Sequence, residues 1–74
     1  MTALPVVSGR EVVKALEKMG YVFDRARGSH MILRQHDPPH RRLTVPNHDE
    51  VAKGTLRAII RQAGLTVEEF NDLF

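Results

Sequence analysis

The sequence predicts an α+β domain in which a three-stranded antiparallel sheet carries helices on one face and leaves the other face open. Apolar residues recur at helical spacing near both ends of the chain, whereas three short segments in the middle are rich in β-branched and aromatic residues. Short connections between these segments favour antiparallel neighbours, and helices must cover an apolar sheet face. The expected order is therefore helix, three strands and two helices, and the 74 residues form one domain.

The first helix is expected to begin after Ser8, because Ser8 and Glu11 have the spacing of a capping box. Residues that recur at helical spacing form one apolar stripe along it: Val12, Val13, Leu16 and Met19. Gly20 follows the stripe and can adopt the left-handed conformation with which many helices end. The pattern thus predicts an amphipathic helix that ends just before residue 20.

Three strands are expected in the middle of the chain: one that starts at 21–23, one at 30–34 and one at 42–45. The Gly28-Ser29 pair marks a tight turn between the first two strands. Asp37-Pro38-Pro39 ends the second strand and Pro46 ends the third, because proline has no amide hydrogen to donate to a ladder. These short connections predict a meander of adjacent antiparallel strands.

Two helices are expected to close the chain. The first carries a second apolar stripe and ends at Gly64: Leu56, Ile59, Ile60 and Ala63. Thr66 and Glu69 form another capping box, and the apolar residues Val67, Phe70 and Leu73 accompany it.

The alternation of side chains along a strand predicts which residues face the helices. Met31, Leu33, Leu43 and Val45 are the more apolar set and are expected in the core. The other set then faces outward: His30, Ile32, Arg34, Arg42 and Thr44. In the first strand, Tyr21, Phe23 and Arg25 alternate with Val22, Asp24 and Ala26, and either set can face the core.

Positive charge gathers in the middle of the chain. Residues 25–61 hold eight basic and three acidic side chains, a net charge of +5, although the whole chain carries only +2. Lys53, Arg57 and Arg61 recur every fourth residue and therefore share one helix face, where like charges repel each other by about 0.2–0.5 kcal/mol per pair. A polyanion or an acidic protein is the partner that such charge favours, and a solvated surface is the plain alternative.

Several classes of protein are excluded or disfavoured by composition. The chain has no cysteine, so it has neither a disulfide nor a cysteine-based zinc site, and a reducing, cytoplasmic location is expected. No apolar run is long enough for a membrane span, and residues 1–7 lack the basic region of a signal peptide. His36 and His40 have a metal-ligand spacing, but two ligands do not close a site, so we expect neither a metal nor a cofactor.

The ordered motifs of the chain resemble the HicA family of toxins from prokaryotic toxin–antitoxin pairs. They extend from about Ser8 to the end of the chain: Leu16-Glu17-Lys18-Met19-Gly20-Tyr21, Gly28-Ser29-His30, Val45-Pro46-Asn47-His48, residues 53–65 and Glu68-Glu69-Phe70. The resemblance implies that residues 1–74 form a single HicA-like domain with a fold like that of double-stranded-RNA-binding domains. It also implies an endoribonuclease that cleaves messenger RNA, a HicB-like antitoxin partner, and a catalytic histidine in the Gly-Ser-His motif, which is His30. Met31 stands where many relatives have a second histidine.

The chemistry of these residues fits such a reaction. Imidazole accepts or donates protons near neutral pH, and a guanidinium group suits a phosphate because it is always charged. The hypothesis is that His30 is a general base or acid while Arg34 and Arg42 bind the phosphate, with His48 as one candidate for the second proton transfer. Further RNA contacts are expected from Ser29, Lys53, Arg57 and Arg61. The alternatives are an RNA-binding module of the same fold without catalysis, and a domain that binds an acidic protein.

Overall fold

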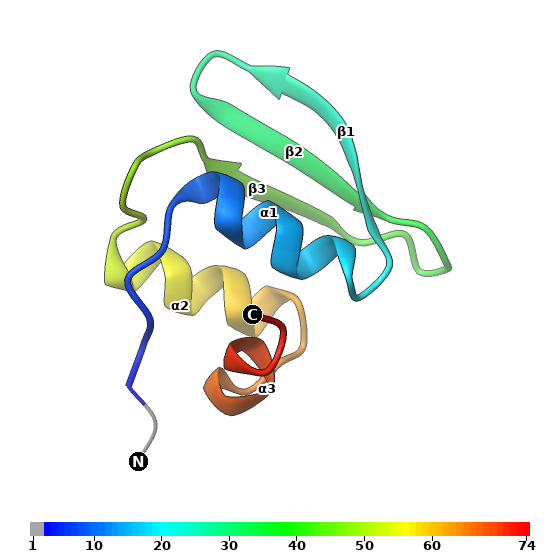
Figure 1. Cartoon of the computed structure of the whole chain (residues 1–74). Helices are drawn as coiled ribbons and strands as arrows, with labels where there is room; N and C mark the ends of the chain where they lie inside the picture. Colours follow the sequence, from blue (N-terminus) through cyan, green and yellow to red (C-terminus); the bar gives the residue numbers. More distant parts are fainter. Residues whose placement is uncertain (1–2) are drawn as a thin grey trace.

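The structure, a computed structural model, describes residues 3–74 and has the predicted order of elements (Figure 1). The elements are α1 (Gly9–Glu17), β1 (Tyr21–Arg27), β2 (His30–Gln35), β3 (Arg42–Pro46), α2 (Lys53–Gln62) and α3 (Val67–Asn71). The sheet order is β1-β2-β3 and both pairings are antiparallel, which confirms the predicted meander. The helices lie on one side of the sheet, and the hairpin of β1 and β2 extends beyond them (Figure 1).

Local signals in the sequence set the ends of the elements. The side chains of Ser8 and Thr66 accept hydrogen bonds from the amides of Glu11 and Glu69, and both capping boxes are complete. Gly20 and Gly64 have φ angles of 97° and 77°, so each supplies the left-handed residue after a helix. Gly28 has a φ of 59° in the two-residue turn between β1 and β2.

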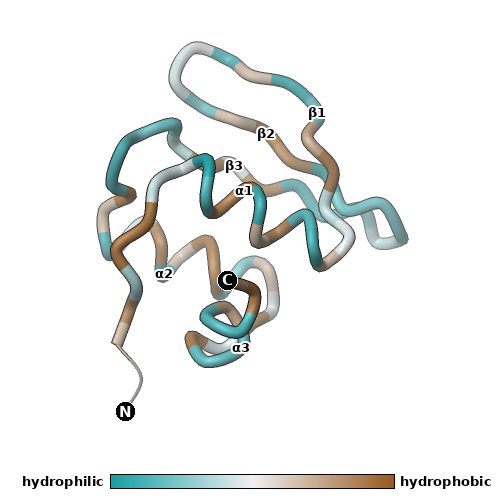
Figure 2. Tube along the Cα trace, in the orientation of Figure 1, coloured by the Kyte–Doolittle hydropathy of each residue, from teal (hydrophilic) through white to brown (hydrophobic). Residues whose placement is uncertain are grey.

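One apolar core lies between the sheet and the helices. Met31, Leu33, Leu43 and Val45 point into it as predicted, and the buried residues of α1 and α2 cover them. Phe70 of α3 is fully buried at its edge. Figure 2 shows the hydrophilic loops after β2 and after β3, which lie away from this core.

Met19 is not the core residue that its spacing predicts. The residue is 36% exposed, and it lies in the turn that follows α1 rather than in the helix itself. Helical spacing places a residue on the buried stripe only while the helix continues, and α1 ends at Glu17. Val12, Val13 and Leu16, which lie inside the helix, are buried as expected.

Candidate active site

Two histidines from separate segments line one pocket on the surface. His30 is the first residue of β2, and His48 lies in the loop between β3 and α2. The other lining residues come from β3 and from the beginning of α2: Thr44, Pro46, Ala52 and Thr55. This histidine pocket has a volume of about 350 Å³, and the side chains of both histidines are exposed. The fold therefore presents two groups that can exchange protons with a bound molecule.

Backbone hydrogen bonds hold the loop of His48 against the turn of His30. The amide of Asn47 donates to the carbonyl oxygen of Ser29 at 2.6 Å, which ties the loop to the Gly28-Ser29 turn. The carbonyl oxygen of His48 itself accepts from the amide of Gly9 at 2.9 Å. Three distant segments thus meet beside the histidine pocket, and the position of His48 depends on all of them.

Gly9 allows the close approach on which this arrangement depends. It is buried at the beginning of α1, and a Cβ atom added there would lie 2.0 Å from the carbonyl oxygen of Pro46. That oxygen belongs to the backbone, so it cannot move aside by the rotation of a side chain. Only glycine lets α1 reach the loop after β3.

A β-bulge at Asp24 decides which residues of β1 face away from the helices. Phe23 pairs with Leu33, but the next pair is Arg25 with Ile32, so Asp24 is the extra residue. The alternation restarts after it, and neither of the two sets expected from the sequence holds along the whole strand. Arg25 and Arg27 therefore share the outer face with Ile32 and His30, their cross-strand partners.

We call this outer surface the open sheet face. Its residues come from all three strands: Val22, Asp24, Arg25, Arg27, His30, Ile32, Arg34, Arg42 and Thr44. The predicted orientation of His30, Arg34 and Arg42 is confirmed, since all three are exposed there. Four arginines give the face a strongly positive potential, which the carboxylate of Asp24 reduces only in part.

The hypothesis that Arg34 and Arg42 bind a phosphate at His30 does not fit the register of the sheet. Arg34 lies four residues from His30 along β2, and Arg42 lies at the level of Arg34 because the two are paired across β2 and β3. At the usual rise of a strand this separation is about 13 Å. Alternation predicts which face a side chain shares, whereas distance along that face depends on the register between strands.

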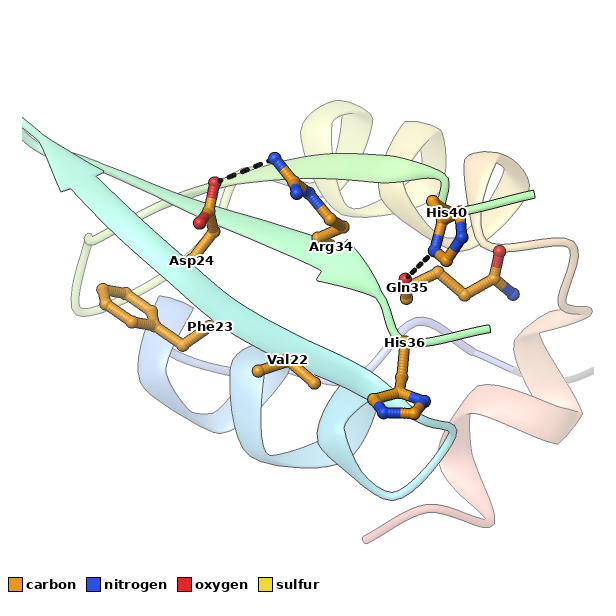
Figure 3. Close-up of a pocket in the computed structure, with 7 residues that line it drawn as sticks. All are labelled: Val22, Phe23, Asp24, Arg34, Gln35, His36 and His40. Carbon is orange, nitrogen blue, oxygen red and sulfur yellow. Dashed lines mark hydrogen bonds and ion pairs between the residues drawn. The ribbon is translucent and has the colours of Figure 1, made fainter. Parts of the chain in front are cut away.

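Arg34 belongs to a different pocket at the far end of the open sheet face. Its guanidinium lies 3.6 Å from a carboxylate oxygen of Asp24, and the two side chains point toward each other in Figure 3. Val22, His36 and His40 also line this second pocket. The ion pair neutralises part of the charge of Arg34, so Arg34 is a weaker phosphate ligand than its sequence position suggests.

Lys53, Arg57 and Arg61 form a basic stripe along α2, and all three are exposed as predicted. The stripe lies in the helical layer, and only its Lys53 end is close to the histidine pocket, which includes Ala52 and Thr55. Arg61 lies about 12 Å further along the helix axis. No side chain caps the first turn of α2 and no acidic residue lies in it, so the positive end of the helix dipole faces the same region.

The other two histidines lie outside the histidine pocket. His36 is bonded to Asp37 at 3.2 Å, and Nδ1 of His40 lies 3.2 Å from the carbonyl oxygen of Gln35. Within residues 3–74, no three histidine or acidic side chains gather as metal ligands would. The same residues include no helix long and apolar enough to span a membrane.

Sequence reasoning missed two groups of functional candidates. Arg25 and Arg27 were not assigned because the bulge that turns them outward has no clear sequence signal. Gly9 was not assigned because its neighbour, Pro46, is distant in the chain. A glycine directly after a capping serine is unfavourable for a helix, and this was the one local signal that could have pointed to it.

The fold and the site define a small α+β domain with a basic sheet face and a pair of surface histidines. The sequence profile of the HicA toxins of bacterial toxin–antitoxin systems matches residues 9–65, well over half of the chain. The chain therefore belongs to the HicA toxin family, which confirms the resemblance seen in its motifs.

A solved structure agrees with this assignment. A chain of the "Toxin-Antitoxin complex from Streptococcus pneumoniae" is 35% identical to this one, with a TM-score of 0.69. The alignment covers 80% of this chain and 98% of that chain. A search of curated proteins found no significant match.

Proposed function

We propose that this HicA-family protein is an endoribonuclease that cleaves messenger RNA without a metal ion and acts as the toxin of a toxin–antitoxin pair. The observation that carries the proposal is the histidine pocket, where His30 and His48 lie at the end of an arginine-rich sheet face. His30 also stands in the Gly-Ser-His motif, in which the family has its catalytic histidine.

The proposed reaction needs two proton transfers. The ribose 2′-oxygen attacks the adjacent phosphorus, the bond from phosphorus to the 5′-oxygen breaks, and a 2′,3′-cyclic phosphate forms. One histidine accepts the proton of the 2′-hydroxyl, and the other donates a proton to the departing 5′-oxygen. Because the products carry the same number of protons as the substrate, two imidazoles of opposite protonation state are sufficient.

The remaining cationic residues would hold the RNA. Lys53 and the beginning of α2 lie beside the histidine pocket, so they are placed for phosphates close to the cleaved bond. Arg42, Arg57 and Arg61 would bind phosphates further away, and Arg34 would contribute less because it is paired with Asp24. The role of Ser29 is in part structural, since its carbonyl oxygen holds the loop of His48.

Cleavage of a defined messenger RNA in the presence of EDTA tests the proposal. The wild-type protein should produce fragments that end in 2′,3′-cyclic phosphate, while a DNA strand of the same sequence stays intact because it lacks the 2′-hydroxyl. His30→Ala should lose about 10²–10⁴-fold in rate, with an unchanged melting temperature because His30 is exposed. His36→Ala is the matched control, an exposed histidine outside the histidine pocket. RNA that is bound but never cut would favour the non-catalytic RNA-binding module instead.

We further propose that a HicB-like antitoxin silences the toxin by covering a basic surface. The motivation is charge: the open sheet face and the basic stripe both attract an acidic protein. Association should then be fast at low salt and slow markedly at high salt. A rate insensitive to salt would mean that the antitoxin binds an apolar surface elsewhere.

A further inference from the structure

We propose that Arg27 is the residue that binds the phosphate group at the cleaved bond and holds it against His30. This inference rests on the proposed ribonuclease function and adds to it a substrate-binding residue that the sequence left unassigned. Arg27 replaces Arg34 and Arg42 as the proposed ligand of this phosphate, because both of those arginines lie at the other end of the open sheet face.

Register places Arg27 directly across from His30. The two residues flank the Gly28-Ser29 turn and are paired in the ladder of β1 and β2. Side chains of directly paired residues project from the same face, with Cβ atoms about 4.5–5.5 Å apart. The bulge at Asp24 is responsible, since without it the alternation of Tyr21 and Phe23 toward the core would turn Arg27 toward the helices as well.

The charge of Arg27 is available to a ligand. Within residues 3–74, no carboxylate lies within ion-pair distance of its guanidinium, whereas Arg34 is paired with Asp24. Arg27 is exposed on a hairpin that extends beyond the helices (Figure 1). It can therefore bind an anion without first breaking an interaction within the protein.

The chemistry of the step explains why a guanidinium is needed there. Negative charge builds up on the non-bridging oxygens as the 2′-oxygen attacks phosphorus. A planar guanidinium can donate two parallel hydrogen bonds to two of these oxygens and bind them most strongly when that charge is greatest. Lysine, a point charge, reproduces the attraction but not the paired geometry. Arg27 takes no part in the proton transfers, which remain with the histidines.

The test compares Arg27→Ala and Arg27→Lys with Arg42→Ala, an exposed arginine at the far end of the same face. Cleavage is measured at saturating RNA, and affinity is measured separately in a His30→Ala background so that the RNA stays intact. We expect Arg27→Ala to lower kcat about 10²–10³-fold, Arg27→Lys to recover part of the loss, and Arg42→Ala to change mainly the affinity. Added methylguanidinium at millimolar concentration should partly restore Arg27→Ala and leave the other variants unchanged.

The outcomes separate this inference from the function on which it rests. If wild type cleaves, His30→Ala does not, and Arg27→Ala cleaves at the wild-type rate, only the assignment of Arg27 is wrong. Equal losses in kcat for Arg27→Ala and Arg42→Ala would also overturn it, because the two ends of the open sheet face would then contribute alike to the chemical step. If the wild-type protein cleaves no RNA, the ribonuclease function fails and the assignment of Arg27 fails with it. Melting temperatures of the variants should match wild type, since both arginines are exposed.

Discussion

The two ends of the open sheet face carry similar charge but differ in the other functional side chains near them. At the hairpin end, Arg27 and His30 lie side by side, and the loop after β3 adds His48 from a different segment. At the other end, Arg34 and Arg42 face each other, and Asp24 neutralises part of the charge of Arg34. Both ends can attract RNA, but among the described residues only the hairpin end combines a cation with the two histidines proposed to transfer protons.

The difference indicates that charge alone does not locate the candidate active site. Arginines are found along the whole sheet, whereas the histidine pocket exists only where backbone hydrogen bonds bring a distant loop to the Gly28-Ser29 turn. Long-range attraction tolerates displacement of a charge by several ångströms, but proton transfer needs hydrogen-bond distance. Substitutions at the two ends should therefore differ in kind, changing catalysis at one end and affinity at the other.

The largest effect is expected from the pair of histidines. His48→Ala should lower the cleavage rate about 10²–10⁴-fold. The His30→Ala/His48→Ala double variant should cleave almost as fast as the less active of the two single variants. Residues that act in one step are strongly non-additive, because removing either one already disables it. Single-turnover cleavage by the three variants measures this. If the rate loss of the double variant equals the product of the two single losses, the two histidines act independently.

Gly9→Ala should have the next largest effect, although Gly9 does not line the histidine pocket. The added methyl group overlaps the carbonyl oxygen of Pro46, so α1 must move away from the loop that carries His48. Overpacking of this kind costs about 1–3 kcal/mol, and each kcal/mol lowers the melting temperature of a small domain by about 4–8 °C.

Gly54→Ala provides the matched control for this prediction. Gly54 lies in the first turn of α2, and an added Cβ would meet no atom within 4 Å. Alanine favours a helix over glycine by up to about 1 kcal/mol, so this variant should melt at the same temperature as wild type or higher and should still cleave RNA. Thermal melting and cleavage of both variants decide the point. If Gly9→Ala is as stable and active as Gly54→Ala, the loop is not held by this contact.

A smaller effect is expected from reversing charge on the basic stripe. Arg57→Glu/Arg61→Glu should weaken RNA binding for all sequences alike, because phosphate contacts carry no sequence information. The slope of log affinity against log salt should decrease by about 0.7 for each phosphate of single-stranded RNA that the variant no longer binds. Binding titrations at several salt concentrations, in the His30→Ala background, give this slope. An unchanged slope would mean that the basic stripe does not contact RNA, and antitoxin binding would remain its candidate role.

The smallest effect is expected at the far end of the sheet. Asp24→Asn releases Arg34 from its ion pair, so RNA affinity should increase slightly while kcat stays the same. Surface ion pairs contribute at most about 1 kcal/mol to stability, so the melting temperature should hardly change. A fall in kcat would show that this end, too, takes part in catalysis.

Local patterns in the sequence determined the elements and most of the core. Capping boxes at Ser8 and Thr66, glycines at the helix ends and the alternation in β2 and β3 each act within a few residues, so they can be recognised without a partner. The same alternation correctly turned His30 toward solvent. The Gly-Ser-His motif and the other ordered segments were sufficient to recognise the family.

Only the tertiary structure decided how the candidate site is assembled. One extra residue at Asp24 reversed the alternation of β1 and brought Arg27 beside His30, and the register of β2 with β3 moved Arg34 and Arg42 away from it. The contact of Gly9 with Pro46 and the hydrogen bonds of the following loop placed His48 in the same pocket. The physical reason is the separation along the chain of the residues that determine each feature. Side-chain periodicity is a property of a single strand, whereas register, bulges and loop positions depend on contacts between segments that are distant in the chain.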